Sequence, residues 1–268
     1  MDYCIVCKNS TKFDFFDMSK EILICQICQC VFSKSNKIET FPNITKSGIY
    51  QNIKNRINHL TSLSYYEFLK KSNLKIQNCF DIGAGEGHFL KILEKDGIKT
   101  EGIEFNEKTW KLREVSSIKL GNFESYINKK NYDLISINQT IYYFDDPIQI
   151  LKKMQKMLTP DGHIMIVTTN MNSKFRKENK IWTQGCKICL SESNFKNFSF
   201  IGLDLIKIQN FDDKIYRDYY LSKKSIIRKI IFFLKLFPRV YLFKNFICQN
   251  KDGINYFVLL KNNGIIKN

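Results

Sequence analysis

Residues 80–90 read FDIGAGEGHFL, an apolar run followed by a glycine-rich turn and the start of a helical pattern. Glycines in such a turn let the backbone pass close to a ligand without a collision at Cβ. The glycines are Gly83, Gly85 and Gly87, and His88 stands where the third glycine of a G-x-G-x-x-G dinucleotide pattern belongs. No G-K-[ST] segment follows to hold a triphosphate. The turn therefore predicts a nucleotide-like ligand that is neither a dinucleotide nor ATP.

Strand and helix patterns alternate on both sides of this turn. Four apolar runs indicate strands: NCFDIG at 78–83, TEGIEF at 100–105, YDLISIN at 132–138 and HIMIVTTN at 163–170. Two amphipathic runs indicate helices: HFLKILEKDG, which Gly97 closes, and DPIQILKKMQKML, which begins at Pro147. Strands and helices in series predict an α/β fold whose mostly parallel sheet has helices on both faces.

Two carboxylates lie at the ends of the first two predicted strands. Asp81 can accept hydrogen bonds from a cationic or amino group, and Glu104 can accept both hydroxyls of a ribose. A carboxylate at Glu104 would also repel a 2′-phosphate. Because ligands of open parallel sheets bind at the carboxyl ends of the strands, these residues predict a nucleoside cofactor with an amino-acid tail.

The motif series resembles that of class I S-adenosylmethionine (SAM)-dependent methyltransferases. DIGAGEG, then GIE about 20 residues later, then DLISIN and LTPDGHIMIV follow the order of that family over about residues 79–170. The segments LDLIKIQ and NYFVLLK look like the last, antiparallel pair of its Rossmann-like sheet. The resemblance implies SAM as the cofactor. The residues that it assigns to SAM binding are Asp81, Gly83, Gly85, Gly87, Glu104, Asn122, Phe123 and Asn138.

Seven of these positions have an expected role by the same resemblance. The three glycines would pass under the methionine moiety, Asp81 would orient its amino end, and Glu104 would bind the ribose hydroxyls. Asn122 and Phe123 match the position that flanks the adenine, and Asn122 stands where aspartate is commoner.

Four of the nine cysteines form two C-x-x-C pairs near the start of the chain, separated by 17 residues. This spacing is typical of a zinc site in which each pair forms a tight turn that directs both sulfurs at one ion. The predicted zinc ligands are Cys4, Cys7, Cys25 and Cys28. Cys30 is left outside this site. A third pair, Cys186 and Cys189, has no partner pair nearby and is expected to consist of core thiols.

The cysteine module and a later segment resemble methyltransferases of sugar and surface-polysaccharide pathways. Those enzymes open with a zinc ribbon in which C-x-x-C-G is usual, and Gln29 replaces the glycine here. DDPIQILKKM is similar to a segment that often reads E-H-x-x-D-P, and Tyr142 and Tyr143 stand at the E-H positions. Both tyrosines are candidates for the catalytic site, Tyr143 for orienting the acceptor or removing its proton. The long carboxy-terminal domain of sugar C-methyltransferases is absent, which implies transfer to oxygen or nitrogen.

These landmarks divide the chain into three parts. Residues 1–40 form a zinc-ribbon module, residues 41–75 a helical linker, and residues 76–268 the methyltransferase domain. Within the domain, a basic apolar helical insert is expected at about 213–250. Its run IIRKIIFFLKLF falls short of the roughly 20 residues that a bilayer span needs. The part at 225–247 can instead rest on an anionic membrane or pack on the domain.

The chain carries 42 Lys and Arg against 26 Asp and Glu, and its net charge of +16 favours an anionic partner. One basic cluster, NSKFRKENK at 172–180, directly follows a predicted strand, so it should lie at the edge of the sheet where ligands bind. We therefore expect Lys174, Arg176 and Lys177 to hold a phosphate-bearing acceptor.

The predicted function is methyl transfer from SAM to an oxygen or nitrogen of a nucleotide-linked sugar, or of another phosphorylated precursor of a capsule or surface polysaccharide. One alternative is an rRNA or tRNA methyltransferase with a zinc module, which would use the basic charge. Another is a non-catalytic zinc-ribbon binding protein. Nucleic acid is the weaker expectation, because no N-P-P-[YF] segment follows YDLISIN. No secretory signal opens the chain, which indicates a cytoplasmic protein, with the inner face of the membrane as a second location.

Overall fold

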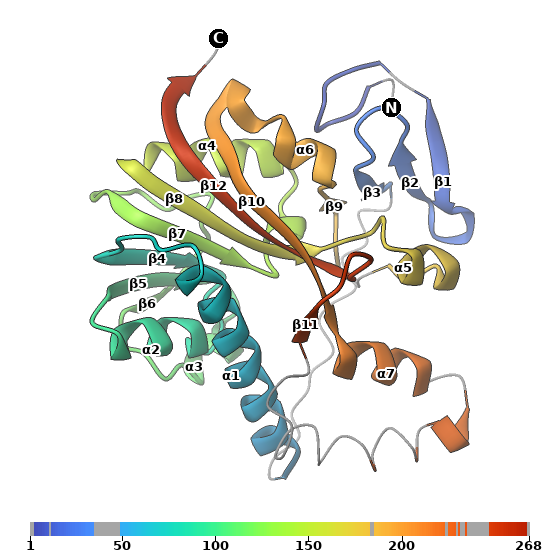
Figure 1. Ribbon diagram of the computed structural model, residues 1–268, viewed down its shortest axis with the longest axis horizontal. Helices are drawn as coiled ribbons and strands as arrows, with labels where there is room; N and C mark the ends of the chain where they lie inside the picture. Colours follow the sequence, from blue (N-terminus) through green and yellow to red (C-terminus); the bar gives the residue numbers. More distant parts are fainter. Residues whose placement is uncertain are drawn as a thin grey trace.

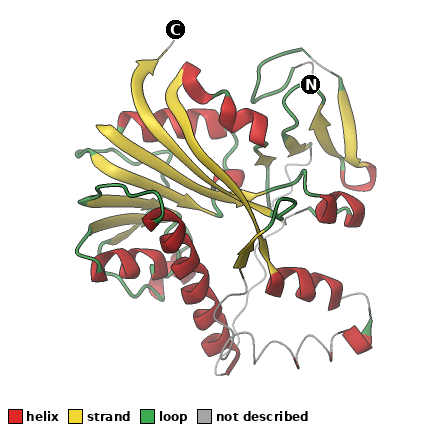
Figure 2. Cartoon of the chain, viewed as in Figure 1, coloured by secondary structure: helices red, strands yellow, loops and turns green. Residues whose placement is uncertain are grey.

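The computed structural model describes residues 3–10, 12–34, 49–182, 185–222, 225–228, 230, 234 and 247–266. Within these residues, the strands form an eight-stranded central sheet and a four-stranded sheet near the amino terminus. Figure 1 shows the central sheet as a twisted layer that has helices on both faces. Figure 2 shows the smaller sheet beside it, close to the amino terminus.

The central sheet has the strand order β11-β10-β12-β8-β7-β4-β5-β6. Strands β8, β7, β4, β5 and β6 are parallel to one another, and β12 runs antiparallel between β8 and β10. The Rossmann-like sheet with a late antiparallel strand is thereby confirmed. The strands are β4 (Asn78–Ile82), β5 (Lys99–Glu104), β6 (Ile118–Leu120), β7 (Tyr132–Asn138), β8 (Leu158–Thr169), β10 (Ile201–Asp213), β11 (Ile247–Gln249) and β12 (Asn255–Ile266).

The two helices that amphipathic runs indicate, after the glycine-rich turn and from Pro147, are both present. Asp146 caps the helix that begins at Pro147, because its side chain accepts hydrogen bonds from N of Ile148 and Gln149 at 3.0 and 3.1 Å. The α-helices are α1 (Ile49–Lys70), α2 (His88–Lys95), α3 (Glu107–Lys111), α4 (Pro147–Lys156), α5 (Lys174–Asn179), α6 (Glu192–Lys196) and α7 (Lys214–Ser222). Three short 3-10 helices are η1 (Met18–Lys20), η2 (Ile141–Tyr143) and η3 (Phe198–Phe200).

Alternate residues of the central strands contribute to two separate cores. On β7, Ile135 belongs to the apolar cluster that contains Leu151 of α4. Its neighbour Leu134 belongs to the cluster that contains Leu90 of α2 and Phe68 of α1. Strands that are buried on both faces need apolar residues at nearly every position, which explains why these segments read as continuous apolar runs.

Helix α1, expected as part of a linker, packs along the central sheet. Phe68 stacks on Phe257 of β12 with ring centroids 4.7 Å apart, and Tyr65 meets the same ring edge-on at 5.4 Å. Nζ of Lys54 lies 3.0 Å from Oε1 of Glu86 in the glycine-rich turn. Residues 41–48 of the expected linker lie outside the described residues. Helix α1 therefore covers the sheet and contacts the turn where the cofactor is expected.

The smaller sheet joins the amino-terminal residues to a later part of the chain. Its strands, in spatial order, are β1 (Phe13–Asp17), β2 (Ile22–Cys25), β3 (Val31–Ser33) and β9 (Ile188–Cys189). Strand β9 pairs antiparallel with β3, with Val31 opposite Cys189 and Phe32 opposite Ile188. Cys186 and Cys189 are buried, as expected of core thiols. Strands β1 and β2 connect the two cysteine pairs, β3 follows the second pair, and the pairing of β9 with β3 was not foreseen from the sequence.

The insert expected at about 213–250 is described only in part. Helix α7 and strand β11 lie in it, whereas residues 223–224, 229, 231–233 and 235–246 lie outside the described residues. Four of its apolar side chains are more than half exposed: Ile226, Ile227, Ile230 and Leu234. Among the helices that the structure describes, none is long and apolar enough to cross a membrane.

Candidate cofactor site and cysteine cluster

The glycine-rich turn leaves β4 and enters α2, and its three glycines have positive φ: 70° at Gly83, 60° at Gly85 and 87° at Gly87. A Cβ at Gly83 would lie 2.4 Å from Oγ1 of Thr140, and one at Gly87 would lie 2.8 Å from Cδ1 of Ile118. A Cβ at Gly85 would meet no atom within 4 Å. Packing inside the protein thus requires two of the glycines, whereas Gly85 faces open space that a ligand can fill.

Asp81, at the end of β4, is 2% exposed. Its Oδ1 accepts hydrogen bonds from Oγ of Ser136 at 2.6 Å and from Nδ2 of Asn138 at 3.4 Å. Burial raises the pKa of the Asp81 carboxyl to about 7, and the nearby carboxylate of Glu104 acts in the same direction. The buried Oδ1 of Asn138 has no hydrogen-bond partner among the described residues. A protonated amino group at this point would stabilise the carboxylate and satisfy the amide oxygen, which fits the amino end of SAM.

Glu104, at the end of β5, is held by the backbone of the neighbouring turns. Its Oε2 accepts a hydrogen bond from N of Gly85 at 2.9 Å, and its Oε1 accepts one from N of Asn106 at 2.8 Å. Burial raises the pKa of this carboxyl, and the two backbone hydrogen bonds oppose that shift. Each oxygen keeps a second lone pair, so the fixed carboxylate can still accept hydrogen bonds from two ribose hydroxyls.

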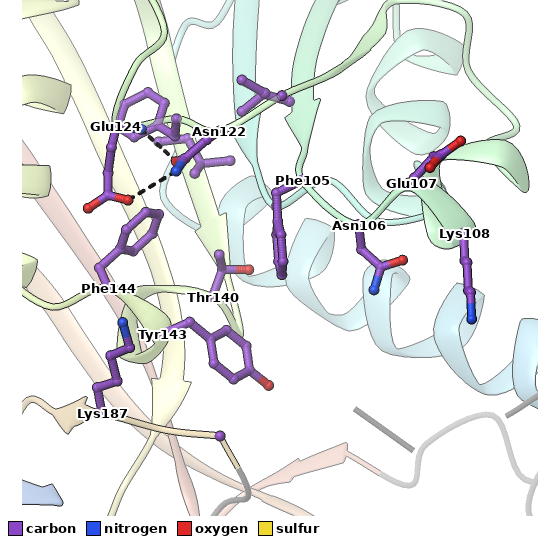
Figure 3. Close-up of a pocket in the computed structure, with 16 residues that line it drawn as sticks. Phe105, Asn106, Glu107, Lys108, Asn122, Glu124, Thr140, Tyr143, Phe144 and Lys187 are labelled. Carbon is purple, nitrogen blue, oxygen red and sulfur yellow. Dashed lines mark hydrogen bonds between the residues drawn. The ribbon is translucent and has the colours of Figure 1, made fainter. Parts of the chain in front are cut away.

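A cavity of about 660 Å³ opens at the carboxyl ends of β4, β5 and β7 (Figure 3). Of the residues assigned to SAM, Gly83, Asn122 and Phe123 line it. Phe105 also lines it and projects into it from the end of β5 (Figure 3). The sequence reading did not assign Phe105, although its position directly after the strand-end Glu104 was the signal that could have identified it.

Asn122 and Phe123 shape the cavity wall next to β6. Oδ1 of Asn122 accepts a hydrogen bond from N of Glu124 at 2.9 Å, and its Nδ2 donates one to Oε2 of Glu124 at 3.2 Å (Figure 3). Phe123 is 3% exposed and packs near Phe80 and Tyr126. The amide of Asn122 therefore stabilises a local turn, and Phe123 is mainly a core residue whose surface reaches the cavity.

The two catalytic candidates differ in their surroundings. Tyr142 is buried, and its hydroxyl donates a hydrogen bond to Oε1 of Gln139 at 3.1 Å. Tyr143 lines the cavity and points into it (Figure 3). Burial raises the pKa of both phenols above the ordinary value. Because a raised pKa keeps the hydroxyl protonated at neutral pH, Tyr143 can donate a hydrogen bond to a ligand but is a poor general base.

The basic residues expected at the acceptor site are not among those that line the cavity. Arg176 is 2% exposed, its Nε donates a hydrogen bond to O of Ile254 at 3.2 Å, and its guanidinium lies 5.3 Å from the ring centre of Tyr216. Lys174 and Lys177 are exposed on α5, and Nζ of Lys174 is 3.7 Å from Oε1 of Glu178. Successive helical positions point in different directions, so Arg176 faces inward while its neighbours face outward.

Lys187 is one of two lysines that line the cavity, and the other is Lys108 of α3. Lys187 lies in the wall next to Tyr143 (Figure 3). Its Nζ lies 2.7 Å from Oδ1 of Asp145, which is largely exposed. Lys187 lies between Cys186 and Cys189, a pair that the sequence indicated only as core thiols. Its sequence context carried no signal for a ligand site, because the two cysteines turn inward and leave the lysine at the cavity.

The four predicted zinc ligands come together in one cluster. The sulfur atoms of Cys4, Cys7, Cys25 and Cys28 all lie within 4.8 Å of one another. Sγ of Cys4 is 3.7 Å from that of Cys28, and Sγ of Cys7 is 3.9 Å from that of Cys25. Four sulfurs at about 2.3 Å from a tetrahedral zinc ion would be about 3.8 Å apart, so the cluster fits the metal.

Cys30 is a fifth thiol in contact with this cluster. Its Sγ lies 3.4 Å from that of Cys4. Hydrogen bonds from Cys28 and Cys30 lower the pKa of Cys4 to about 5, whereas hydrogen bonds with Cys28 and Cys4, and then burial, raise the pKa of Cys30. The thiolate, which is the form that binds metal, is thus favoured at Cys4 and disfavoured at Cys30.

Both cysteine turns use a residue in the left-handed region directly after the second cysteine. These residues are Lys8, with φ of 58°, and Gln29, with φ of 59°. N of Lys8 donates to O of Cys4 at 2.8 Å, and N of Gln29 donates to O of Cys25 at 2.9 Å. Glycine would adopt this φ most easily, but Nε2 of Gln29 bonds the carbonyls of Cys25 and Gln26 and so stabilises the turn.

Comparisons with known proteins agree with this fold. A family model described as "Methyltransferase domain" matches residues 51–200. A SAM-dependent methyltransferase from Archaeoglobus fulgidus superimposes with a TM-score of 0.54 at 16% identity, over 80% of this chain and 100% of that one. The plantazolicin methyltransferase BpumL in complex with SAH gives 0.51 at 17% identity, over 80% and 88%. The chain belongs to this methyltransferase family, and its fold is similar to that of these SAM-dependent methyltransferases.

Curated relatives give a more limited picture. The ubiquinone biosynthesis O-methyltransferase of Vibrio cholerae is 21% identical over 119 residues, which are 41% of this chain and 49% of the relative. The chain thus matches about half the length of that relative. At this level of similarity the class of enzyme is shared, and the acceptor has to be argued from the residues of this chain.

Proposed function

We propose that the protein transfers a methyl group from SAM to an oxygen or nitrogen atom of a small anionic acceptor. The observation that carries the proposal is the set of Asp81, Asn138, Gly85 and Glu104 at the carboxyl ends of adjacent strands. These residues offer an amine site, a passage free of side chains, and a ribose site. When bound, SAM supplies a methyl group on a sulfonium, which is already activated for transfer. The task left to the chain is to hold donor and acceptor in line.

We assign Tyr143 and Lys187 to the acceptor side. Both line the cavity, and the protonated phenol of Tyr143 can donate a hydrogen bond to the accepting group. The ammonium of Lys187, held 2.7 Å from Asp145, provides a positive charge for a phosphate or carboxylate. In this proposal Lys187 takes the role first expected of Lys174, Arg176 and Lys177. Transfer of the methyl group to a hydroxyl releases one proton, and the carboxylates that line the cavity, Glu107 and Glu124, are the groups that can accept it, because Tyr143 stays protonated.

The acceptor class that we retain is a nucleotide-linked sugar or another phosphorylated precursor of a surface polysaccharide. Its support is the similarity of the cysteine module to that of sugar-pathway methyltransferases, together with Lys187 in the cavity wall. The names of the curated relatives state transfer to oxygen, which supports oxygen over nitrogen as the accepting atom.

Calorimetry with SAH tests the cofactor site. Glu104→Ala should bind SAH at least about tenfold more weakly, because it loses a charged acceptor for ribose hydroxyls. Glu101→Ala is the matched control: it removes a carboxylate of the same strand, which pairs with Lys130 at 2.5 Å on the surface, and should bind SAH within about twofold of the parent. Equal affinities of the two variants would contradict the site.

A methylation assay with labelled SAM and a panel of nucleoside diphosphate sugars tests the acceptor. Lys187→Ala should raise KM for a charged acceptor and reduce its dependence on salt, while Lys174→Ala leaves both unchanged. Faster methylation of uncharged sugars than of nucleoside diphosphate sugars would contradict the acceptor class. Methylation of total RNA by the same preparation would also contradict it.

We further propose that Cys4, Cys7, Cys25 and Cys28 bind one structural zinc ion. The support is the fit of the four sulfurs to a tetrahedral site and the small size of the module, which has too little core to fold without its metal. Metal analysis of the purified protein should find about one equivalent of zinc.

We also propose a cytoplasmic location, with contact to anionic membranes through residues 225–247. The support for membrane contact is the exposure of four apolar side chains next to basic residues, although most of this segment lies outside the described residues. Co-sedimentation with vesicles that contain anionic lipid, compared with neutral vesicles, tests it. Equal recovery with both would contradict the membrane contact.

A further inference from the structure

The second cysteine turn is where the cysteine cluster contacts the methyltransferase domain. Oγ of Ser193 donates a hydrogen bond to O of Cys28 at 2.6 Å, and Oγ of Ser191 donates to the same carbonyl. Nδ2 of Asn172 donates to O of Gln29 at 3.1 Å. Three side chains of the domain therefore hold two carbonyls of the turn that carries the sulfur atoms.

Strand β9 connects this contact to the cavity. N of Ser33 donates to O of Lys187 at 3.0 Å, and N of Lys187 donates to O of Tyr142 at 2.7 Å. The ring of the next residue, Tyr143, lies against Gly185, where a Cβ would be 3.4 Å from Cε1 of the ring. Tyr143, Gly185 and Lys187 all line the cavity (Figure 3). One wall of the cavity is thus joined to β3 by consecutive backbone hydrogen bonds.

A separate apolar cluster fills the space between the smaller sheet and this wall. Its members come from β2, β3, η2, the end of β8 and the segment around β9. They are Ile22, Val31, Tyr142, Met171, Cys186 and Cys189. The ribbon therefore supports the wall by packing as well as by hydrogen bonds.

The cofactor carboxylates are held by other elements. Asp81 is bonded by Ser136 and Asn138 of β7, and Glu104 by the backbone of Gly85 and Asn106. These partners belong to the central sheet and its turns, and their geometry does not pass through β3 or β9. The cofactor carboxylates and the acceptor-side wall are thus held by different hydrogen bonds, although one apolar cluster contains residues of the ribbon as well as Ile82 of β4 and Ile103 of β5.

We propose that zinc binding to the ribbon orders the acceptor-side wall formed by Tyr143, Gly185 and Lys187, while the cofactor contacts of β4 and β5 do not depend on the metal. This inference rests on the proposed function, because it uses the zinc and acceptor assignments made there. The physical reason is that β9 has only two residues, and β3 is its sole partner strand in the described part of the chain. Without zinc the ribbon loses its fold, β9 loses its partner, and the wall loses its backing.

Hydrogen exchange of the full chain, with zinc and after its removal by a chelator under reducing conditions, tests the proposal. Peptides that cover 140–145 and 185–190 should exchange at least about tenfold faster without zinc. Peptides that cover 78–84 and 99–105 should stay within about twofold. Unchanged exchange in the first pair would overturn the proposal. Equal acceleration in both pairs would also overturn it, because zinc would then stabilise the whole domain.

A double variant tests the same connection with all cysteines intact. Ser193→Ala with Asn172→Ala removes two of the hydrogen bonds to the cysteine turn, so exchange in 140–145 and 185–190 should rise by about threefold at unchanged zinc content. Ser72→Ala is the matched control, since its Oγ bonds O of Phe68 within α1 at 3.3 Å, and should change neither peptide. Equal exchange in the double variant, the control and the parent would contradict the connection.

Binding of SAH to the same samples separates the two proposals. Zinc-loaded protein that fails to bind SAH would contradict the proposed function, yet the exchange measurement needs no cofactor and would still report on the wall. Normal SAH binding with zinc-independent exchange of the wall would overturn only the present inference.

Discussion

Replacing Asp81 by Asn should separate the cofactor role of this residue from its effect on stability. Burial raises the pKa of its carboxyl to about 7, against 3.8 for a free side chain. The folded protein then keeps a proton that the unfolded chain releases, so the contribution of the carboxyl to stability is fully present below about pH 4 and is lost as pH rises through about 7. The pKa difference between the folded and the unfolded protein corresponds to at most about 4 kcal/mol in free energy of unfolding.

The variant removes this pH dependence while keeping a hydrogen-bond acceptor. An Asn side chain presents an oxygen to Ser136 and Asn138 in place of Oδ1 of Asp81. Without cofactor, the parent should therefore lose about 2 to 3 kcal/mol of its free energy of unfolding as the pH rises from about 5 to about 8, and Asp81→Asn should not show this loss. Denaturant unfolding at several pH values measures this loss, and parallel pH profiles of variant and parent would refute the assignment of the shifted pKa to Asp81.

Cofactor affinity should change in the opposite direction. The ionised carboxylate is the form that binds an amino group, so the parent should bind SAH about twentyfold more tightly at about pH 7.5 than at about pH 5.5. Asp81→Asn should bind at least about tenfold more weakly at pH 7.5 and show little pH dependence. Calorimetry that finds the affinity of the parent constant over this range, or the variant as tight as the parent, would refute the reasoning.

Three further outcomes follow from contacts described above. Gly83→Ala should lower the free energy of unfolding by about 2 kcal/mol or more, because the new Cβ would lie 2.4 Å from Oγ1 of Thr140, and a second change, Thr140→Gly, should recover part of the loss in denaturant unfolding. Arg176→Ala should lower the free energy of unfolding by about 3 kcal/mol, measured by thermal unfolding, since a buried backbone carbonyl loses its hydrogen-bond donor. Unchanged stability together with a raised KM for the acceptor would instead place Arg176 at the acceptor site. Cys25→Ser should lose zinc on metal analysis, whereas Cys30→Ser should keep about one equivalent; loss in both would make Cys30 a ligand.

The features that local patterns encode were predictable from the sequence. The glycine-rich turn, the strand-end carboxylates and the paired cysteines each depend on residues close together in the chain, so their spacing carries the information. The mostly parallel sheet was predictable because strands and helices in series permit few topologies. Asp81, Asn138 and Glu104 accordingly lie at the carboxyl edge of the sheet, as expected.

The features that depend on distant pairing were not predictable. No local pattern connects Val31 with Cys189, because a two-residue strand has no periodicity to recognise. For the same reason the pattern around Lys187 indicated only a pair of core thiols, and the lysine was not identified as a cavity residue. The basic run at 172–180 shows the converse, since its cations are adjacent in sequence but Arg176 is directed into the core by the turn of α5.

Strand β12 has a consequence for the order in which the chain can fold during synthesis. It lies between β8 and β10, and roughly 85 residues separate it from β8. At about 5 to 20 residues per second, the ribosome needs about 4 to 17 s to make that stretch. During this interval β8, whose residues Ile164–Val167 are completely buried in the finished protein, has an open edge that can pair with other nascent chains. Chains that stop before residue 255 should therefore collect in the aggregated fraction during expression, and slower initiation of translation should raise the yield of folded protein.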